Sequence, residues 1–165
     1  MMAHSHVVFG LALWTGVAAL HGAPAGGPID LGLVVIGSLL PDIDHPSSWF
    51  GRRLPFISWP LAALVGHRGV THSGLAIAAW AAAIAACGSS LWLGPLAVGY
   101  LSHVLGDCLT PSGVPMLWPS RRRFRIPLFR TNSLAEHVSI GVLAVGLVYH
   151  SGLLGSLDGV AGALR

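Results

Sequence analysis

The sequence predicts an all-α protein, an integral membrane bundle of about four to five helices with a cluster of polar side chains at one end. Hydrophobic residues make up 53% of the 165 residues and charged residues only 9%, whereas about a quarter of an ordinary soluble domain is charged. Turn-forming sequences divide the chain into five apolar segments. No linker or long charged run separates two halves, so we expect residues 1–165 to form a single membrane-embedded domain.

The five apolar segments are the predicted helices, and they lie at about 7–21, 30–41, 74–88, 91–108 and 138–155. Clusters of Gly, Pro, Ser and Asp at 21–28, 41–48, 87–90 and 110–115 separate them. Most segments are shorter than the ~20 residues that cross a bilayer, so the number of full spans stays open. The first segment has no Lys or Arg before it and no convincing cleavage site, which predicts a retained helix.

The arginines predict the orientation in the membrane. When the five segments are threaded alternately across a bilayer, eight of the nine arginines fall in the connections 45–72 and 109–135, on one side. The positive-inside rule assigns that side to the cytoplasm. The same threading places Cys87 and Cys108 at opposite ends of a helical hairpin, so we expect both thiols to be free.

Histidines and acidic residues gather at the same predicted membrane level. His103 and Asp107 are four residues apart and therefore share one face of a helix. A carboxylate within a membrane helix needs compensation, and His with Asp or Glu is a ligand set that suits zinc and related divalent metals. The predicted metal-binding residues are His6, Asp42, Asp44, His67, His72, His103, Asp107 and Glu136.

Several members of this set have alternatives that the sequence leaves open. Asp42 and Asp44 could simply cap a turn, and Glu136 could be a helix N-terminal charge favoured by the dipole. Which member of the Asp42/Asp44 and His67/His72 pairs contacts a metal is undecided. His45 and His137 adjoin stronger candidates and are predicted to orient the ligands by hydrogen bonds.

Three long motifs resemble the YdjM-like family of bacterial inner-membrane proteins, which are described as metal-dependent hydrolases. They are "LLPDIDHPSSWFGRRL", "GHRGVTHSGLA" and "GYLSHVLGDCLTPSGVPMLWPSRRRFRIP", and the resemblance covers roughly residues 3–138. It implies an integral inner-membrane protein with hydrolase activity. Members are at times labelled as LexA-binding, which implies a regulatory protein partner.

A more remote similarity is to the zinc phospholipase C fold, an α-helical class in which an Asp, a His and a His-x-x-x-Asp pair surround a zinc site. Asp42 or Asp44, His67 or His72, and the pair His103 and Asp107 match those places. The further His-x-x-x-Glu signature of that fold is missing, because Glu136 has no His four residues before it. The similarity therefore does not imply a full trinuclear centre.

These observations predict a metal-dependent hydrolase that cleaves a phosphoester, with a membrane lipid as one candidate substrate. One or two zinc ions, or manganese or iron, would activate a water molecule. The predicted catalytic residues are Asp44, Arg68 and Asp107, with Arg68 binding the substrate phosphate. No nucleic-acid-binding module is recognisable. The alternative is a membrane protein that binds metal without catalysis, either a regulatory or scaffold protein or a metal transporter.

Overall fold

The computed structural model describes residues 1–21, 26–66, 68–87, 92–120 and 122–150. It confirms the all-α fold, since the described residues form helices and contain no β-strand. The α-helices are α1 (Ala3–Leu20), α2 (Pro28–Leu39), α3 (Pro55–Val65), α4 (Gly74–Cys87), α5 (Leu93–Cys108) and α6 (Leu134–His150). Two short 3₁₀-helices are η1 (Leu40–Asp44) and η2 (Val70–His72).

Five of the α-helices match the five predicted segments, except that residues 151–155 of the last segment lie outside the described residues. The sixth α-helix, α3, was not predicted from the sequence, and it lies within the connection at 45–72. Pro55 occupies the first turn of this helix, where a missing N–H is tolerated. Pro60 lies inside it, and two prolines so close together are more typical of a loop.

Helix length gives limited support for the predicted membrane bundle. Among the described residues, α1 is the one helix long and apolar enough to cross a membrane. The helices α3, α4 and α6 are apolar but shorter. Cys87 at the end of α4 and Cys108 at the end of α5 are both free thiols, as predicted.

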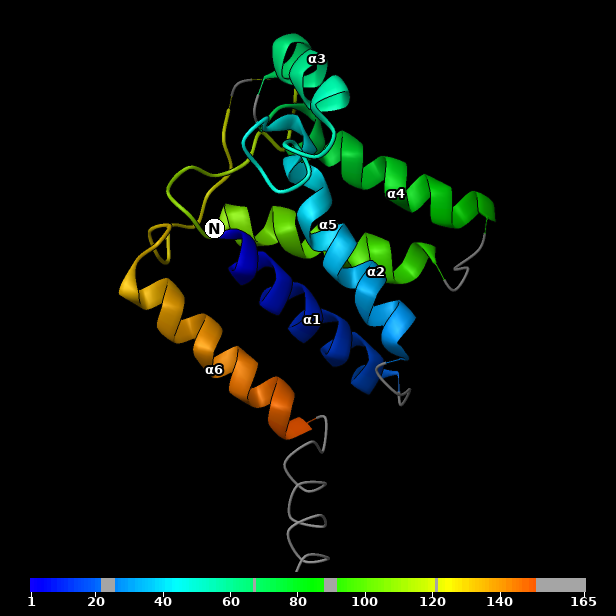
Figure 1. Ribbon diagram of the computed structural model, residues 1–165, viewed down its shortest axis with the longest axis vertical. Helices are drawn as coiled ribbons and strands as arrows, with labels where there is room; N and C mark the ends of the chain where they lie inside the picture. Colours follow the sequence, from blue (N-terminus) through cyan, green and yellow to red (C-terminus); the bar gives the residue numbers. More distant parts are fainter. Residues whose placement is uncertain (22–25, 67, 88–91, 121, 151–165) are drawn as a thin grey trace, which may run out of the picture.

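Helix α5 lies at the centre of the fold and packs against α1, α2 and α4 (Figure 1). Glycines bring α2 and α5 into close contact: a Cβ atom added at Gly37 would lie 2.3 Å from the carbonyl oxygen of Leu96, and one added at Gly99 would lie 2.3 Å from that of Val34. Small residues at helix crossings allow such approach in membrane proteins. The α2–α5 contact therefore depends on both glycines.

We expect Gly99→Val to destabilise the protein by about 1–3 kcal/mol or more, because its side chain would overlap the backbone of α2. Thermal unfolding in detergent would measure the effect. Gly16→Val is the matched control, since a Cβ at Gly16 meets no atom within 4 Å. Equal unfolding temperatures for the two variants would contradict the close contact between α2 and α5.

The polar ends of the helices meet at one end of the bundle (Figure 1). The start of α1 and the end of α5 lie side by side there, and a Cβ at Gly106 would come within 3.3 Å of the His6 ring. η1 continues from α2 and contacts η2, which directly precedes α4. The fold thus brings the start of α1, η1, η2 and the end of α5 to one place.

Candidate metal centre

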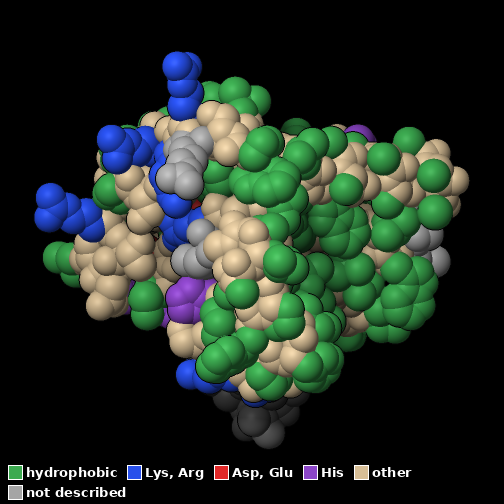
Figure 2. Space-filling model, turned by 90° about the horizontal axis from the view of Figure 1, so that it is seen from above, with side chains coloured by type: hydrophobic (Ala, Val, Ile, Leu, Met, Phe, Trp, Pro, Cys, Tyr) green, Lys and Arg blue, Asp and Glu red, His purple; other side chains and the backbone are tan. Residues whose placement is uncertain are grey.

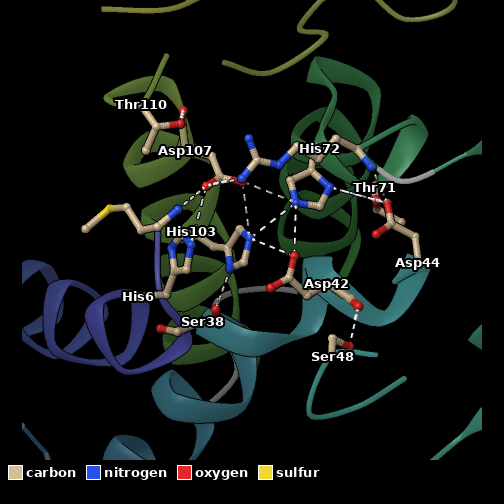
Figure 3. Close-up of polar contacts among 12 residues, drawn as sticks. His6, Ser38, Asp42, Asp44, Ser48, Thr71, His72, His103, Asp107 and Thr110 are labelled. Carbon is tan, nitrogen blue, oxygen red and sulfur yellow. Dashed lines mark hydrogen bonds and ion pairs between the residues drawn. The ribbon is translucent and has the colours of Figure 1, made fainter. Parts of the chain in front are cut away.

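Four side-chain atoms face one another at this end of the bundle (Figure 3). They are Oδ1 of Asp42 on η1, Nε2 of His72 on η2, and Nε2 of His103 and Oδ2 of Asp107 on α5. The two histidine nitrogens are 3.2 Å apart. Asp42 lies 3.6 Å from His72 and 3.5 Å from His103, and Asp107 lies 3.6 Å and 3.7 Å from the same two nitrogens.

The separations among Asp42, His72 and His103 fit three ligands of one metal ion. Ligands about 2.0–2.1 Å from a zinc ion at tetrahedral angles are about 3.3–3.4 Å from one another. The Asp42, His72 and His103 atoms are 3.2–3.6 Å apart, and Asp107 Oδ2 lies 3.6–3.7 Å from the two histidine nitrogens. Oδ2 of Asp107 is buried and has no hydrogen-bond partner among the described residues. A buried carboxylate oxygen without a partner is costly unless a cation compensates for it. The donor set therefore fits a divalent metal.

Backbone and carboxylate contacts orient the two histidines toward this point. The Nδ1–H of His103 donates to the carbonyl oxygen of Ser38 at 2.7 Å, which directs the Nε2 lone pair toward the other donors. On the far side of the His72 ring, Nδ1 lies 3.0 Å from Thr71 Oγ1 and 3.4 Å from Asp44 Oδ2. Such a carboxylate–histidine contact is typical of metal-binding histidines.

Asp44 joins two parts of the site. Its Oδ2 atom accepts hydrogen bonds from the backbone N–H of Arg68, at 3.0 Å, and from the Thr71 hydroxyl. Asp44 therefore lies behind His72 rather than among the four facing atoms, whereas Asp42 lies among them.

The other oxygen of Asp107 contacts a second set of groups. Oδ1 lies 2.8 Å from the Met1 amino group, 2.9 Å from Arg68 Nη2 and 3.4 Å from His6 Nε2. The His6 ring stacks on the His103 ring with centroids 3.7 Å apart. His6, His103 and Asp107 thus form a second buried group that could hold a metal ion.

Hydrogen bonds and charges of two histidines favour the ionised form of Asp42. Burial opposes its ionisation, but hydrogen bonds from His103 and His72 outweigh it and hold the pKa of Asp42 below its usual range. Burial alone would lower the pKa of His72, yet its hydrogen bonds to Asp42 and Asp44 raise that pKa above its usual value. A cation at this position, whether a proton or a metal, is therefore stabilised.

The remaining predicted residues lie apart from the four facing atoms. Glu136 accepts from the backbone N–H groups of Met2, at 2.8 Å, and Asn132, at 2.7 Å, and so ties the start of α1 to the start of α6. His45 Nδ1 accepts from Ser47, and His137 Nδ1–H donates to the Ser133 carbonyl. His67 lies outside the described residues.

Sequence analysis did not single out Thr71, Ser38 or Tyr100. Thr71 contacts both Asp44 and His72, and its backbone carbonyl accepts a hydrogen bond from the Tyr100 hydroxyl. The position of Thr71 directly before a predicted ligand was an available signal. Ser38 contributes its backbone carbonyl, and because every residue has one, the residue type does not predict this contact.

We expect Asp44→Ala to weaken metal binding by about 10- to 100-fold, because Asp44 orients His72 without lying among the four facing atoms. Metal titration of the purified variant would measure the change. Asp30→Ala, which removes a carboxylate at the start of α2, is the control. A complete loss of binding in Asp44→Ala would instead make Asp44 a direct ligand.

The fold and this site define an all-helical protein with a buried His and Asp cluster that could hold a metal at one end of the bundle. The model of the YdjM inner membrane protein family matches residues 1–161. The chain belongs to the YdjM inner membrane protein family, and its location is the inner membrane.

Curated relatives support this assignment. The chain is 50% identical over 100 residues to the inner membrane protein YdjM of Escherichia coli K12 and, equally, to that of Shigella flexneri. Each match covers 57% of this chain and 51% of the relative, so the chain spans about half the length of these two curated relatives. The uncharacterized protein YvsG of Bacillus subtilis 168 is 30% identical over 154 residues, covering 91% of this chain and 94% of YvsG.

No solved structure matches the chain. The similarity to the zinc phospholipase C fold stays a prediction.

Proposed function

We propose that this protein is a multi-pass inner-membrane hydrolase that uses a divalent metal, with zinc as the first candidate, to cleave a phosphoester on the cytoplasmic side. The observation that carries the proposal is the pair of histidine nitrogens 3.2 Å apart, with a carboxylate oxygen of Asp42 and one of Asp107 each 3.5–3.7 Å from both nitrogens and with Arg68 directly beside them. A bound metal would lower the pKa of a coordinated water and so supply hydroxide at neutral pH. The chain's own residues would bind and orient the substrate.

Arg68 is the group that would hold the phosphate. Its Nη2 donates to Asp107 Oδ1, which fixes the guanidinium next to the donor group. A guanidinium offers five N–H donors in a planar fork that matches phosphate oxygens. Arg68 also has a φ of 57°, in the left-handed region that non-glycine residues rarely adopt. The hydrogen bond from its backbone N–H to Asp44 holds this conformation and couples Arg68 to His72.

The test of this function is hydrolysis of bis(p-nitrophenyl) phosphate by protein purified in detergent without chelator and reconstituted with one metal at a time. Asp42→Asn should abolish turnover, because it removes a charged donor while keeping the side-chain shape. Asp30→Asn is the matched control. Protein that binds metal tightly but hydrolyses no phosphoester would favour a regulatory or scaffold role.

Orientation can be tested separately. Eight arginines lie in the connections 45–72 and 109–135, which adjoin the donor group, so the positive-inside rule predicts a cytoplasmic site. We expect a single cysteine at position 120 to resist a membrane-impermeant maleimide in intact cells and to react after the inner membrane is permeabilised. Labelling in intact cells would reverse the orientation.

A further inference from the structure

A pocket of about 440 Å³ opens beside the donor group. Its walls include Val65, Arg68, Pro115, Trp118, Ser120 and Arg123. Of the described residues that line it, two are arginines and none is acidic, so the pocket favours an anion. Its size is that of sites that bind small molecules or headgroups.

Arg68 connects this pocket to the donor group. Its side chain is only 14% exposed, and its Nη2 atom lies 2.9 Å from Asp107 Oδ1. The other oxygen of Asp107 faces His72 and His103. Asp107 alone therefore separates Arg68, and a phosphate that it binds, from the proposed metal.

One edge of the pocket is the end of α3, which exposes an apolar surface. Trp59 is 68% exposed and Leu64 is 83% exposed, and Phe56 is exposed as well. Ser58 is the one buried residue of α3. Eleven residues span about 16 Å, too short to cross a bilayer core of about 30 Å. An exposed apolar surface of this size in an inner-membrane protein is covered if the helix lies along the membrane instead of crossing it.

The segment at the opposite edge of the pocket also exposes apolar side chains, here mixed with arginines. Exposed Leu117, Phe124, Ile126 and Leu128 alternate with exposed arginines at 122, 123 and 125. Arginines also precede α3, and Arg53 lies 3.7 Å from the centre of the Trp49 ring. Figure 2 shows arginine side chains gathered on one side of this end of the molecule, around a hollow, and hydrophobic side chains over much of the rest. Apolar side chains mixed with arginines are complementary to a layer of anionic lipid headgroups.

We propose that α3 and the described residues 117–120 and 122–128 lie in the membrane interface, so that the pocket between them takes the phosphate of a membrane phospholipid from the bilayer. This inference rests on the proposed function and names its substrate class. The phosphate binds between Arg68 and Arg123, and the acyl chains stay in the bilayer along the exposed side chains of α3. The pocket is too small to enclose two acyl chains, but a headgroup enters it without leaving the membrane.

Binding of phosphatidic acid tests this proposal without requiring turnover. Metal-loaded protein in dodecyl maltoside, which carries no phosphate, is mixed with phosphatidic acid or with glycerol 3-phosphate at equal total concentration. Native mass spectrometry then measures the fraction of protein carrying intact ligand. We expect at least tenfold tighter apparent binding of phosphatidic acid than of glycerol 3-phosphate.

Three variants locate the binding. Arg123→Gln should weaken phosphatidic acid binding by about tenfold, whereas Arg130→Gln, which removes an exposed arginine that does not line the pocket, should leave it unchanged. The double variant Phe56→Ser, Trp59→Ser should weaken binding of the lipid but not of glycerol 3-phosphate. Both α3 residues are exposed, and circular dichroism would confirm that the helices remain folded.

Each other outcome overturns the inference. Equal binding of the two ligands would indicate a soluble phosphoester, and lipid binding insensitive to Arg123→Gln would place the lipid elsewhere. If neither ligand binds, the pocket does not bind a phosphate. Failure of hydrolysis would appear only in the turnover assay and would count against the proposed function alone.

Discussion

The alanine variants of His103 and Asp107 are expected to purify without tightly bound metal. His103→Ala removes a nitrogen that lies 3.2–3.7 Å from the other three atoms, and Asp107→Ala removes an oxygen that lies 3.6–3.7 Å from the two histidine nitrogens. The loss of affinity should exceed the 10- to 100-fold that follows removal of an orienting partner. Metal analysis of protein purified in detergent, followed by titration with zinc, would measure it.

A purely structural role for the pair predicts a different result. His103→Ala would then lower the unfolding temperature and the yield of protein but leave the metal content of each folded molecule unchanged. Both quantities should be measured on the same preparations. His21→Ala, at the exposed end of α1, is the control and should retain full metal content. Normal metal content in both His103→Ala and Asp107→Ala would exclude the metal centre.

Replacing Arg68 is expected to affect turnover rather than metal binding. Arg68→Met should lower the rate of phosphoester hydrolysis by about 10²–10³-fold, the usual cost of removing a donor that stabilises a developing anion. Arg68→Lys keeps the charge but loses the fork, so we expect an intermediate rate. Both substitutions place a non-glycine residue at the same positive φ and so keep the backbone cost equal.

Steady-state kinetics and metal analysis on the same samples separate this role from a structural one. If Arg68 only neutralises Asp107, then Arg68→Lys should restore the full rate, because a charge alone would suffice. Arg130→Met is the control for loss of an exposed positive charge. An unchanged rate in Arg68→Met would remove this residue from the substrate site.

Periodicity along one helix predicted the part of the site that lies on α5. His103 and Asp107 share a face because residues four apart do so in any α-helix, and the structure places both in the donor group. The pair Asp42 and Asp44 could not be resolved in this way. In a 3₁₀-helix, residues two apart point about 120° away from each other, so one carboxylate faces the donors and the other lies behind His72. The sequence does not predict that residues 40–44 form a 3₁₀-helix.

Contacts made by backbone groups could also not be predicted from the sequence. The carbonyl of Ser38 orients His103 only because α2 and α5 cross closely at their glycines. Glu136 had two readings from sequence, and in the structure its carboxylate holds backbone N–H groups at the starts of α1 and α6. Helix α3 was missed because its two prolines and flanking arginines are typical of a loop.

The hydrogen bond between His103 and Ser38 limits how many ions this end of the protein can hold at once. The imidazole of His103 belongs to both candidate groups, the one with Asp42 and His72 and the one with His6 and Asp107. Its Nδ1 atom is occupied by the Ser38 carbonyl, so a single lone pair on Nε2 remains for a metal. One nitrogen cannot serve two ions, and a second ion would have to bind through His6 and Asp107 Oδ1 without it. If the protein binds metal, we therefore expect one strongly held ion and at most one that exchanges readily.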